Sequence, residues 1–88
     1  MLYLVALKPN DAGAKAGATS YLNSISETCW HEFAGVWFLK SDKTAVEMRD
    51  DLKRILGPNH RVAIAHLAGF AAWHGFDDEA ETWLLRNL

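Results

Sequence analysis

The stretch TCWHEFAGVWFLK, residues 28–40, decides the fold of this 88-residue chain. It is rich in aromatic and β-branched residues on both sides of a single break, Ala34-Gly35. Two such runs joined by a short turn that contains glycine are typical of a β-hairpin. The sequence therefore predicts strands over Cys29–Phe33 and Val36–Lys40. One long strand with a bulge at Gly35 is the alternative interpretation.

A helix is predicted to follow the hairpin, over Thr44–Leu56. Thr44 with Glu47 three residues later forms a capping box, which marks a helix start. Gly57-Pro58 then predicts the end, with the glycine in the left-handed helical conformation. The apolar residues of this segment recur at helical spacing and define the stripe expected to be buried: Met48, Leu52, Ile55 and Leu56.

A strand and a helix are predicted before the hairpin. Leu2–Leu7 is apolar on both faces and is closed by Pro9, which suits a buried central strand. Asp11–Glu27 is predicted to be helical, although Gly13 and Gly17 weaken its first turns. Its apolar stripe comprises Ala14, Ala18, Tyr21, Leu22 and Ile25.

A strand and a third helix are predicted after the second helix. Arg61–Leu67 is again apolar on both sides, and Gly69 ends it. The third helix begins at about Asp77, with acidic residues at its positive end and Arg86 near its negative end. Its apolar face comprises Ala80, Trp83, Leu84 and Leu88.

The resulting order β-α-β-β-α-β-α predicts a single α+β domain over residues 1–88 with a ferredoxin-like βαββαβ fold. Right-handed crossovers place two helices on one face of an antiparallel sheet, with an extra C-terminal helix. The other sheet face is also apolar, whichever residues of the third strand point inward. We therefore expect a second protomer, the C-terminal helix or both to cover it. The residues expected in this dimer or sheet-face packing are Trp37, Leu39, Trp73 and Trp83.

Composition and charge restrict the classes of function. Half of the residues are hydrophobic and four are tryptophan, which is rich for so small a domain and favours association into a homodimer. The net charge of −2 and the dispersed cations disfavour nucleic acid as a partner. Cys29 is the only cysteine, so the sequence predicts a reducing, cytoplasmic location. Met1–Leu7 lacks the basic start of a signal peptide and is too short to span a membrane.

The polar residues predict no metal site, no cofactor and no catalytic residues. His31 and His66 are expected on opposite edge strands, and the chain contains no CxxC, HxxxH or HExxH spacing. Cys29 and His31 share a strand face, but no acid is placed to orient the histidine, so a packed cysteine is the better interpretation.

One run near the C-terminus, Ala71-Ala72-Trp73-His74-Gly75-Phe76, is the most specific piece of a similarity that covers nearly the whole chain. By this run and several other segments, the chain resembles the SinR family of small bacterial proteins, which is unrelated to the sporulation repressor of that name. That family is similar in turn to the ferredoxin-like small subunit of the CRISPR adaptation complex and to the VapD toxins. The resemblance implies a ferredoxin-like fold and a symmetric dimer packed through its sheets. The other matching segments are Trp30-His31-Glu32-Phe33, Val36-Trp37-Phe38-Leu39, Ser41-Asp42, the helix Thr44–Leu56, Leu67-Ala68-Gly69 and Trp83-Leu84.

Metal-dependent nuclease activity in this wider group relies on an aspartate at the end of the first strand. Leu2–Lys8 contains no acidic residue, and Asp11, the nearest, lies beyond Pro9. Asp11 is thus the candidate residue if a divergent nuclease is the function. The sequence favours a non-enzymatic dimeric interaction module instead. A small-ligand-binding regulatory dimer is the other alternative.

Overall fold

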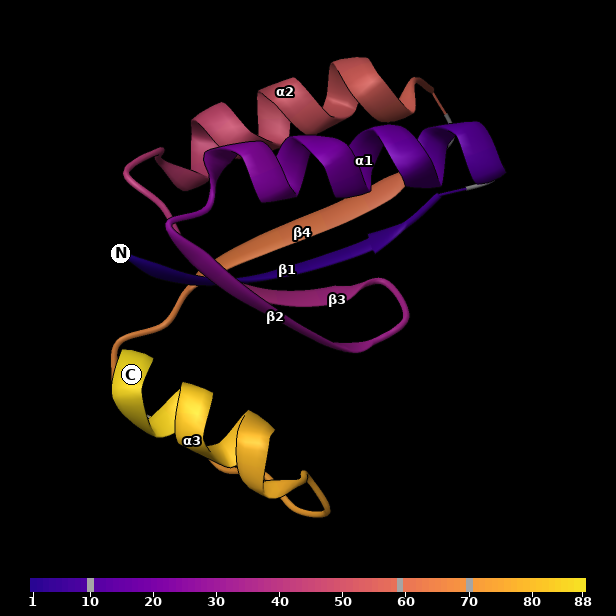
Figure 1. Ribbon diagram of the computed structural model, residues 1–88. Coiled ribbons are helices and arrows are strands. Elements are labelled where there is room, and N and C mark those ends of the chain that lie inside the picture. The colour runs from indigo at the N-terminus through magenta and orange to yellow at the C-terminus, as the bar shows by residue number, and fades with distance from the viewer. Residues whose placement is uncertain (10, 59, 70) are drawn as a thin grey trace.

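The protein is described by a computed structural model, which covers residues 1–9, 11–58, 60–69 and 71–88. Its α+β architecture is a four-stranded antiparallel sheet of order β2-β3-β1-β4 with three helices (Figure 1). This order confirms the predicted ferredoxin-like fold, and the element ends agree with the sequence to within two residues. The elements are β1 (Leu2–Lys8), α1 (Ala12–Ile25), β2 (Thr28–Phe33), β3 (Val36–Lys40), α2 (Ala45–Leu56), β4 (Arg61–His66) and α3 (Asp78–Asn87).

The β2–β3 connection is a tight hairpin, so the interpretation with a single long strand is wrong. Phe33 pairs with Val36, which leaves Ala34-Gly35 as the turn. Gly35 has φ +76, and a Cβ there would lie 2.4 Å from the Leu7 carbonyl oxygen. The Leu7 N–H donates to the Gly35 carbonyl at 2.8 Å, so this close approach ties the hairpin to β1. The sheet irregularity lies within β2, between Trp30 and Phe33.

Helices α1 and α2 cover one face of the sheet, and most of the core lies between them and the strands (Figure 1). Alternate strand residues point to this face because side chains alternate along a strand. Each fully buried leucine or valine there contributes about 1.5–3 kcal/mol relative to an exposed one. The fully buried residues of this core include Tyr3, Val5, Leu22, Leu39, Met48 and Leu52.

Helix α2 begins with the predicted capping box and ends at the predicted residue, Leu56, but the conformation of Gly57 differs in part from the prediction. The capping box is present: the Glu47 N–H donates to Thr44 Oγ1 at 3.1 Å, and the Thr44 N–H donates to Glu47 Oε1 at 3.0 Å. Gly57 is the C-cap and has a positive φ of 76, as predicted, but its ψ of −169 lies outside the left-handed helical region. The residue before a proline is disfavoured in helical conformations, which accounts for this ψ, and glycine tolerates the positive φ because it has no Cβ.

Ile55 is the member of the predicted α2 stripe that is not buried. It is 37% exposed and lies at the edge of the α1–α2 contact. A Cβ at Gly17 would lie 3.1 Å from Ile55 Cγ2, so the small residue lets the two helices approach closely. Gly17 thus lowers the intrinsic stability of α1 and improves its packing on α2.

Helix α3 lies on the opposite side of the sheet from α1 and α2 (Figure 1). Asp77 caps it, because its side chain accepts the Ala80 N–H at 2.8 Å. Ala80 and Leu84 are buried, whereas Trp83 is half-buried and Leu88 is 37% exposed. None of the helices in the described part of the chain combines the length and apolar character needed to cross a bilayer.

Candidate functional site

The structure divides the four residues expected in dimer or sheet-face packing between two layers. Trp37 and Leu39 point from β3 to the face covered by α1 and α2, where both are buried. Trp73 and Trp83 belong to the C-terminal segment, which here means the described residues after β4 together with α3. This segment lies against the sheet face opposite α1 and α2, the second face. Any interaction surface formed by Trp73 and Trp83 therefore lies on the second face.

The C-terminal segment is attached to the second face near the hairpin edge. The indole N–H of Trp83 donates to Thr28 Oγ1 on β2 at 2.9 Å. The rings of Phe33 and Phe76 meet edge to face with centroids 5.6 Å apart. Trp73 donates through its indole N–H to Glu81 Oε1 at 3.2 Å, which ties the preceding loop to α3. These contacts hold the C-terminal segment, which covers part of the second face, on the β2 side of the sheet.

An apolar groove of about 370 Å³ separates the sheet from this cover. Two strand residues, Leu4 and Phe38, form part of its floor, and Trp73, Phe76 and Leu84 form part of its opposite wall. The packing between the sheet and its C-terminal cover is thus looser than the packing under α1 and α2.

The β4 side of the second face carries small, exposed side chains. Ala63 and Ala65 point to this face and are exposed, while Val62 and Ile64 pack partly against the core on the other face. Helix α3 packs mainly against β2, the strand at the far edge of the sheet. In the part of the chain that the structure describes, the half of the second face around β4 is therefore open to solvent.

Strand β4 is also an edge strand, with β1 on one side. In an antiparallel pair, hydrogen-bonded and non-bonded residue pairs alternate along the strand. The Leu67 N–H donates to the Leu2 carbonyl at 2.9 Å, so these two residues form a hydrogen-bonded pair. By the register of the two strands, the next residues of β4 that form hydrogen-bonded pairs with β1 are Ala65 and Ala63. The amides of the intervening residues therefore point away from β1, toward the open edge: those of Val62, Ile64 and His66.

The structure places Asp11 at the start of helix α1, not at the end of a strand. Strand β1 ends at Lys8, and Asp11 Oδ1 accepts the Ala14 N–H at 2.7 Å as the N-cap. One of its two carboxylate oxygens is therefore committed to the helix start. Among the described residues, no group of three or more His, Cys, Asp and Glu side chains converges in a way that could hold a metal ion.

Cys29 is half-buried against the core, and burial raises the pKa of its thiol. A raised pKa lowers the fraction of nucleophilic thiolate at neutral pH. The Sγ atom donates to Asn23 Oδ1 at 3.5 Å. These features are those of a packed cysteine.

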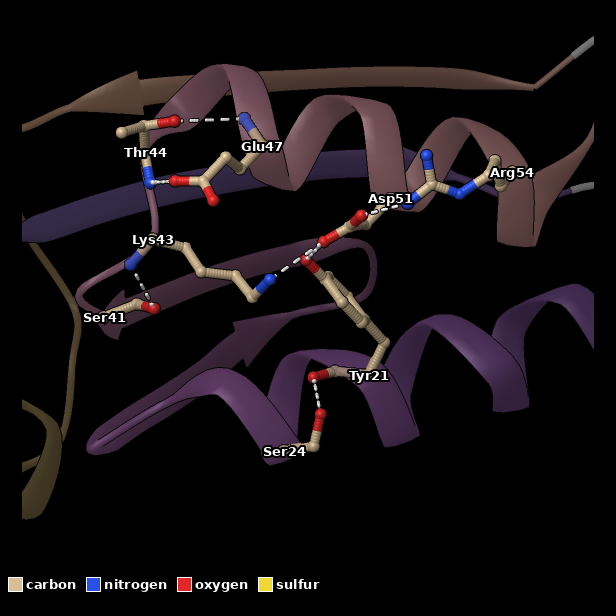
Figure 2. Close-up of polar contacts among 8 residues, drawn as sticks. All are labelled: Tyr21, Ser24, Ser41, Lys43, Thr44, Glu47, Asp51 and Arg54. Atoms are coloured by element: carbon tan, nitrogen blue, oxygen red, sulfur yellow. Dashed lines mark hydrogen bonds and ion pairs between the residues drawn. The ribbon is translucent and has the colours of Figure 1, made fainter.

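A polar cluster that the sequence did not predict joins α1 to α2 (Figure 2). Asp51 accepts hydrogen bonds from the Tyr21 hydroxyl and from Lys43 Nζ, the latter at 3.2 Å, and it also pairs with Arg54. The Tyr21 hydrogen bond, with Lys43 and Arg54 beside it, lowers the pKa of the Asp51 carboxyl. Partial burial and the Asp51 carboxylate raise the pKa of Tyr21.

This cluster fastens the two helices. A tyrosine hydroxyl is protonated at neutral pH even at its ordinary pKa of about 10, so Tyr21 acts as a hydrogen-bond donor. The raised pKa of Tyr21 strengthens this preference, and Asp51 has its charge balanced by neighbouring cations. Nothing in the sequence indicated this contact. Tyr21 was expected in the apolar stripe of α1, and Asp51 lies outside the apolar stripe predicted for α2 and would be expected to face water.

Comparison with known proteins supports the fold and no further assignment. The fold and the open sheet face define a small ferredoxin-like α+β protein. No family model and no curated protein matches the sequence. The crystal structure of a hypothetical protein, TT1823, from Thermus thermophilus is similar, with a TM-score of 0.66 and 23% sequence identity. The match covers 85% of this chain and 90% of that chain, and at this identity it shows the fold alone.

Proposed function

We propose that the protein is a non-catalytic, homodimeric interaction module whose two copies associate through strand β4. The observation that carries this proposal is that β4 is an edge strand without the usual protection. Natural edge strands are commonly guarded by charged side chains, proline or bulges. The sequence of β4, Arg-Val-Ala-Ile-Ala-His, has no proline and one formal charge, Arg61 at its end. Its register with β1 runs without a shift from Arg61 to His66.

A second copy suits this edge because a two-fold axis makes the same strand complementary to itself. Antiparallel pairing centred on Ile64 would set Val62 of one copy opposite His66 of the other. All three outward amide groups would then pair, which uses the groups that an edge strand otherwise leaves to water. An axis perpendicular to the sheet also keeps α1 and α2 of both copies on one side. The two sheets would form one continuous sheet.

The open half of the second face supports the same arrangement. Ala63 and Ala65 are exposed and small, so two copies can approach closely along β4. Joining the sheets would double the flat apolar surface beside them. That surface could then bind a further protein, which is the role of an interaction module.

The test measures molecular mass by light scattering during size-exclusion chromatography at micromolar concentration. We expect a mass twice the 9.8 kDa of one chain. The double variant Ala63→Glu with Ala65→Glu places like charges around the proposed axis and should produce monomers. Ala16→Glu, on the exposed surface of α1, is the matched control and should remain dimeric.

Either of two results would contradict the proposal. One is a mass of one chain for the native protein throughout the elution peak. The other is a dimer that persists in the double variant, which would place the interface elsewhere.

The nuclease alternative has less support in the chain. Asp11 lies three residues beyond the end of β1 and caps α1, so its carboxylate is partly occupied. We expect no cleavage of RNA or DNA by the purified protein with Mg²⁺ or Mn²⁺. Cleavage that disappears in the Asp11→Asn variant would show that this expectation is wrong.

A further inference from the structure

A second concave feature lies at the end of the sheet where β1 meets α1. It is a pocket of about 270 Å³ between the end of β1, the first turns of α1 and the β2–β3 turn. Three elements that are distant in sequence therefore contribute to it. The lining residues that matter here are Leu7, Lys8, Lys15, Thr19, His31 and Trp37.

The polar lining of this pocket is basic, although the protein as a whole has a net charge of −2. Lys8 comes from β1 and Lys15 from α1, and both are exposed. Within the described part of the chain, neither lysine takes part in an ion pair. Asp11, the nearest acidic residue in sequence, does not line the pocket and accepts the Ala14 N–H instead. The two ammonium groups are thus available to an anion.

The remaining lining offers a flat aromatic surface. The imidazole of His31 stacks on the buried indole of Trp37, with centroids 4.1 Å apart and an interplanar angle of 10°. Trp37 fixes the orientation of the imidazole, while His31 itself is exposed. An aromatic surface held in one orientation can stack with a planar ring at low entropic cost.

We propose that this pocket binds a small phosphate monoester that carries a planar ring, that is, a mononucleotide. Lys8 and Lys15 would contact the phosphate, because ammonium groups form strong charge-assisted hydrogen bonds with phosphate oxygens. His31 would stack on the base, and the Thr19 hydroxyl could bind a polar group between them. The volume of about 270 Å³ is close to the lower end of the roughly 300–1,000 Å³ that is typical of ligand pockets, so the pocket suits a small ligand.

This proposal goes beyond dimerisation and does not depend on it. The pocket is formed within one copy of the chain, by β1, α1 and the hairpin, whereas the proposed interface uses the outer edge of β4. Binding and oligomeric state can therefore be measured separately. A result that contradicts nucleotide binding would not contradict dimerisation through β4, and the reverse also holds.

The test is isothermal titration calorimetry of the full chain with adenosine 5′-monophosphate, ribose 5-phosphate and inorganic phosphate, at low salt. We expect saturable binding of all three, with the nucleotide tightest. It should bind about tenfold more tightly than ribose 5-phosphate, because base stacking on an aromatic side chain is worth about 1–3 kcal/mol. Equal binding of the nucleotide and the sugar phosphate would overturn the role of His31 and Trp37.

Variants then locate the site. Lys8→Gln with Lys15→Gln should weaken nucleotide binding by about tenfold or more, since charge-assisted contacts are lost. Lys53→Gln, an exposed lysine of α2 outside the pocket, is the matched control and should bind as the native protein does. Thermal unfolding of each variant confirms that the chain is folded. The proposal is wrong if no binding is detected at millimolar nucleotide or if the double variant binds equally well. Tighter binding of a single-stranded oligonucleotide than of the mononucleotide would also overturn it.

Discussion

The two faces of the sheet are covered in different ways. Under α1 and α2, residues such as Val5, Leu39 and Leu52 are completely buried. On the second face, Leu84 is buried, but a groove of about 370 Å³ remains and Phe33 is 53% exposed. The same four strands thus support one close-packed layer and one loose layer.

The difference follows from how each cover is connected to the strands. Helices α1 and α2 are the crossovers between strands, so the chain cannot form the sheet without placing them on the same face. Helix α3 follows the last strand and is held by side chains alone. Leu84 and the Trp83–Thr28 hydrogen bond belong to the helix, and the Phe33–Phe76 contact belongs to the segment before it. A cover with so few buried contacts should open locally before the whole domain unfolds.

The largest effect is expected for a change in the close-packed layer. Leu52→Ala removes a completely buried side chain of α2 and should lower the free energy of unfolding by about 3–5 kcal/mol. Urea denaturation followed by circular dichroism measures this loss. The control Leu85→Ala, at a side chain that is 69% exposed, should change stability by less than about 0.5 kcal/mol. Similar losses in the two variants would contradict the assignment of the core.

A smaller and more local effect is expected under α3. Leu84→Ala should cost about 2–3 kcal/mol, the low end for a buried leucine, because the groove beside it already limits its packing. Amide hydrogen exchange should show protection lost in α3 and retained in α1 and α2. If protection falls equally in all three helices, α3 unfolds together with α1 and α2. That result would contradict the expected difference in packing between the two faces of the sheet.

The sequence predicted the elements of both layers but not how well each is packed. Element order followed from apolar periodicity and from local signals such as Thr44 with Glu47, which act over a few residues. Burial on α3 was harder to predict, because Trp83 and Leu84 are equally apolar and only the position of β2 decides which one is enclosed. The Tyr21–Asp51 contact joins residues on separate helices, so no local pattern could reveal it. The pocket at Lys8 and Lys15 was missed for the same reason.

The half-buried position of Trp83 changes the effect expected for it. A fully buried indole would make Trp83→Ala cost about 3–5 kcal/mol. Since the side chain is only partly enclosed, we expect about 2 kcal/mol for that variant and about 1 kcal/mol for Trp83→Phe, which chiefly removes the hydrogen bond to Thr28. A double-mutant cycle of Trp83→Phe with Thr28→Val measures the hydrogen bond itself. A coupling energy of zero would mean that the bond does not hold the cover in place.

The smallest effect is expected at the polar cluster that fastens α1 to α2, and it should depend on pH. The Tyr21 hydrogen bond, together with Lys43 and Arg54, lowers the folded-state pKa of Asp51 below its ordinary value of about 4. The charged form therefore stabilises the folded state above about pH 4, and this contribution is lost as the pH falls through the lower, folded-state pKa. Asp51→Asn should lower the urea midpoint at pH 7, and its difference from the native protein should shrink toward pH 3. Asp42→Asn, at an exposed residue, is the control.

A difference in urea midpoint between Asp51→Asn and the native protein that stays constant between pH 7 and pH 3 would contradict the role of the charge. Hydrogen exchange in α3 should be unchanged in Asp51→Asn, since the cluster joins α1 to α2 and does not contact the second face. That result would confine the effect of the variant to the layer formed by α1 and α2.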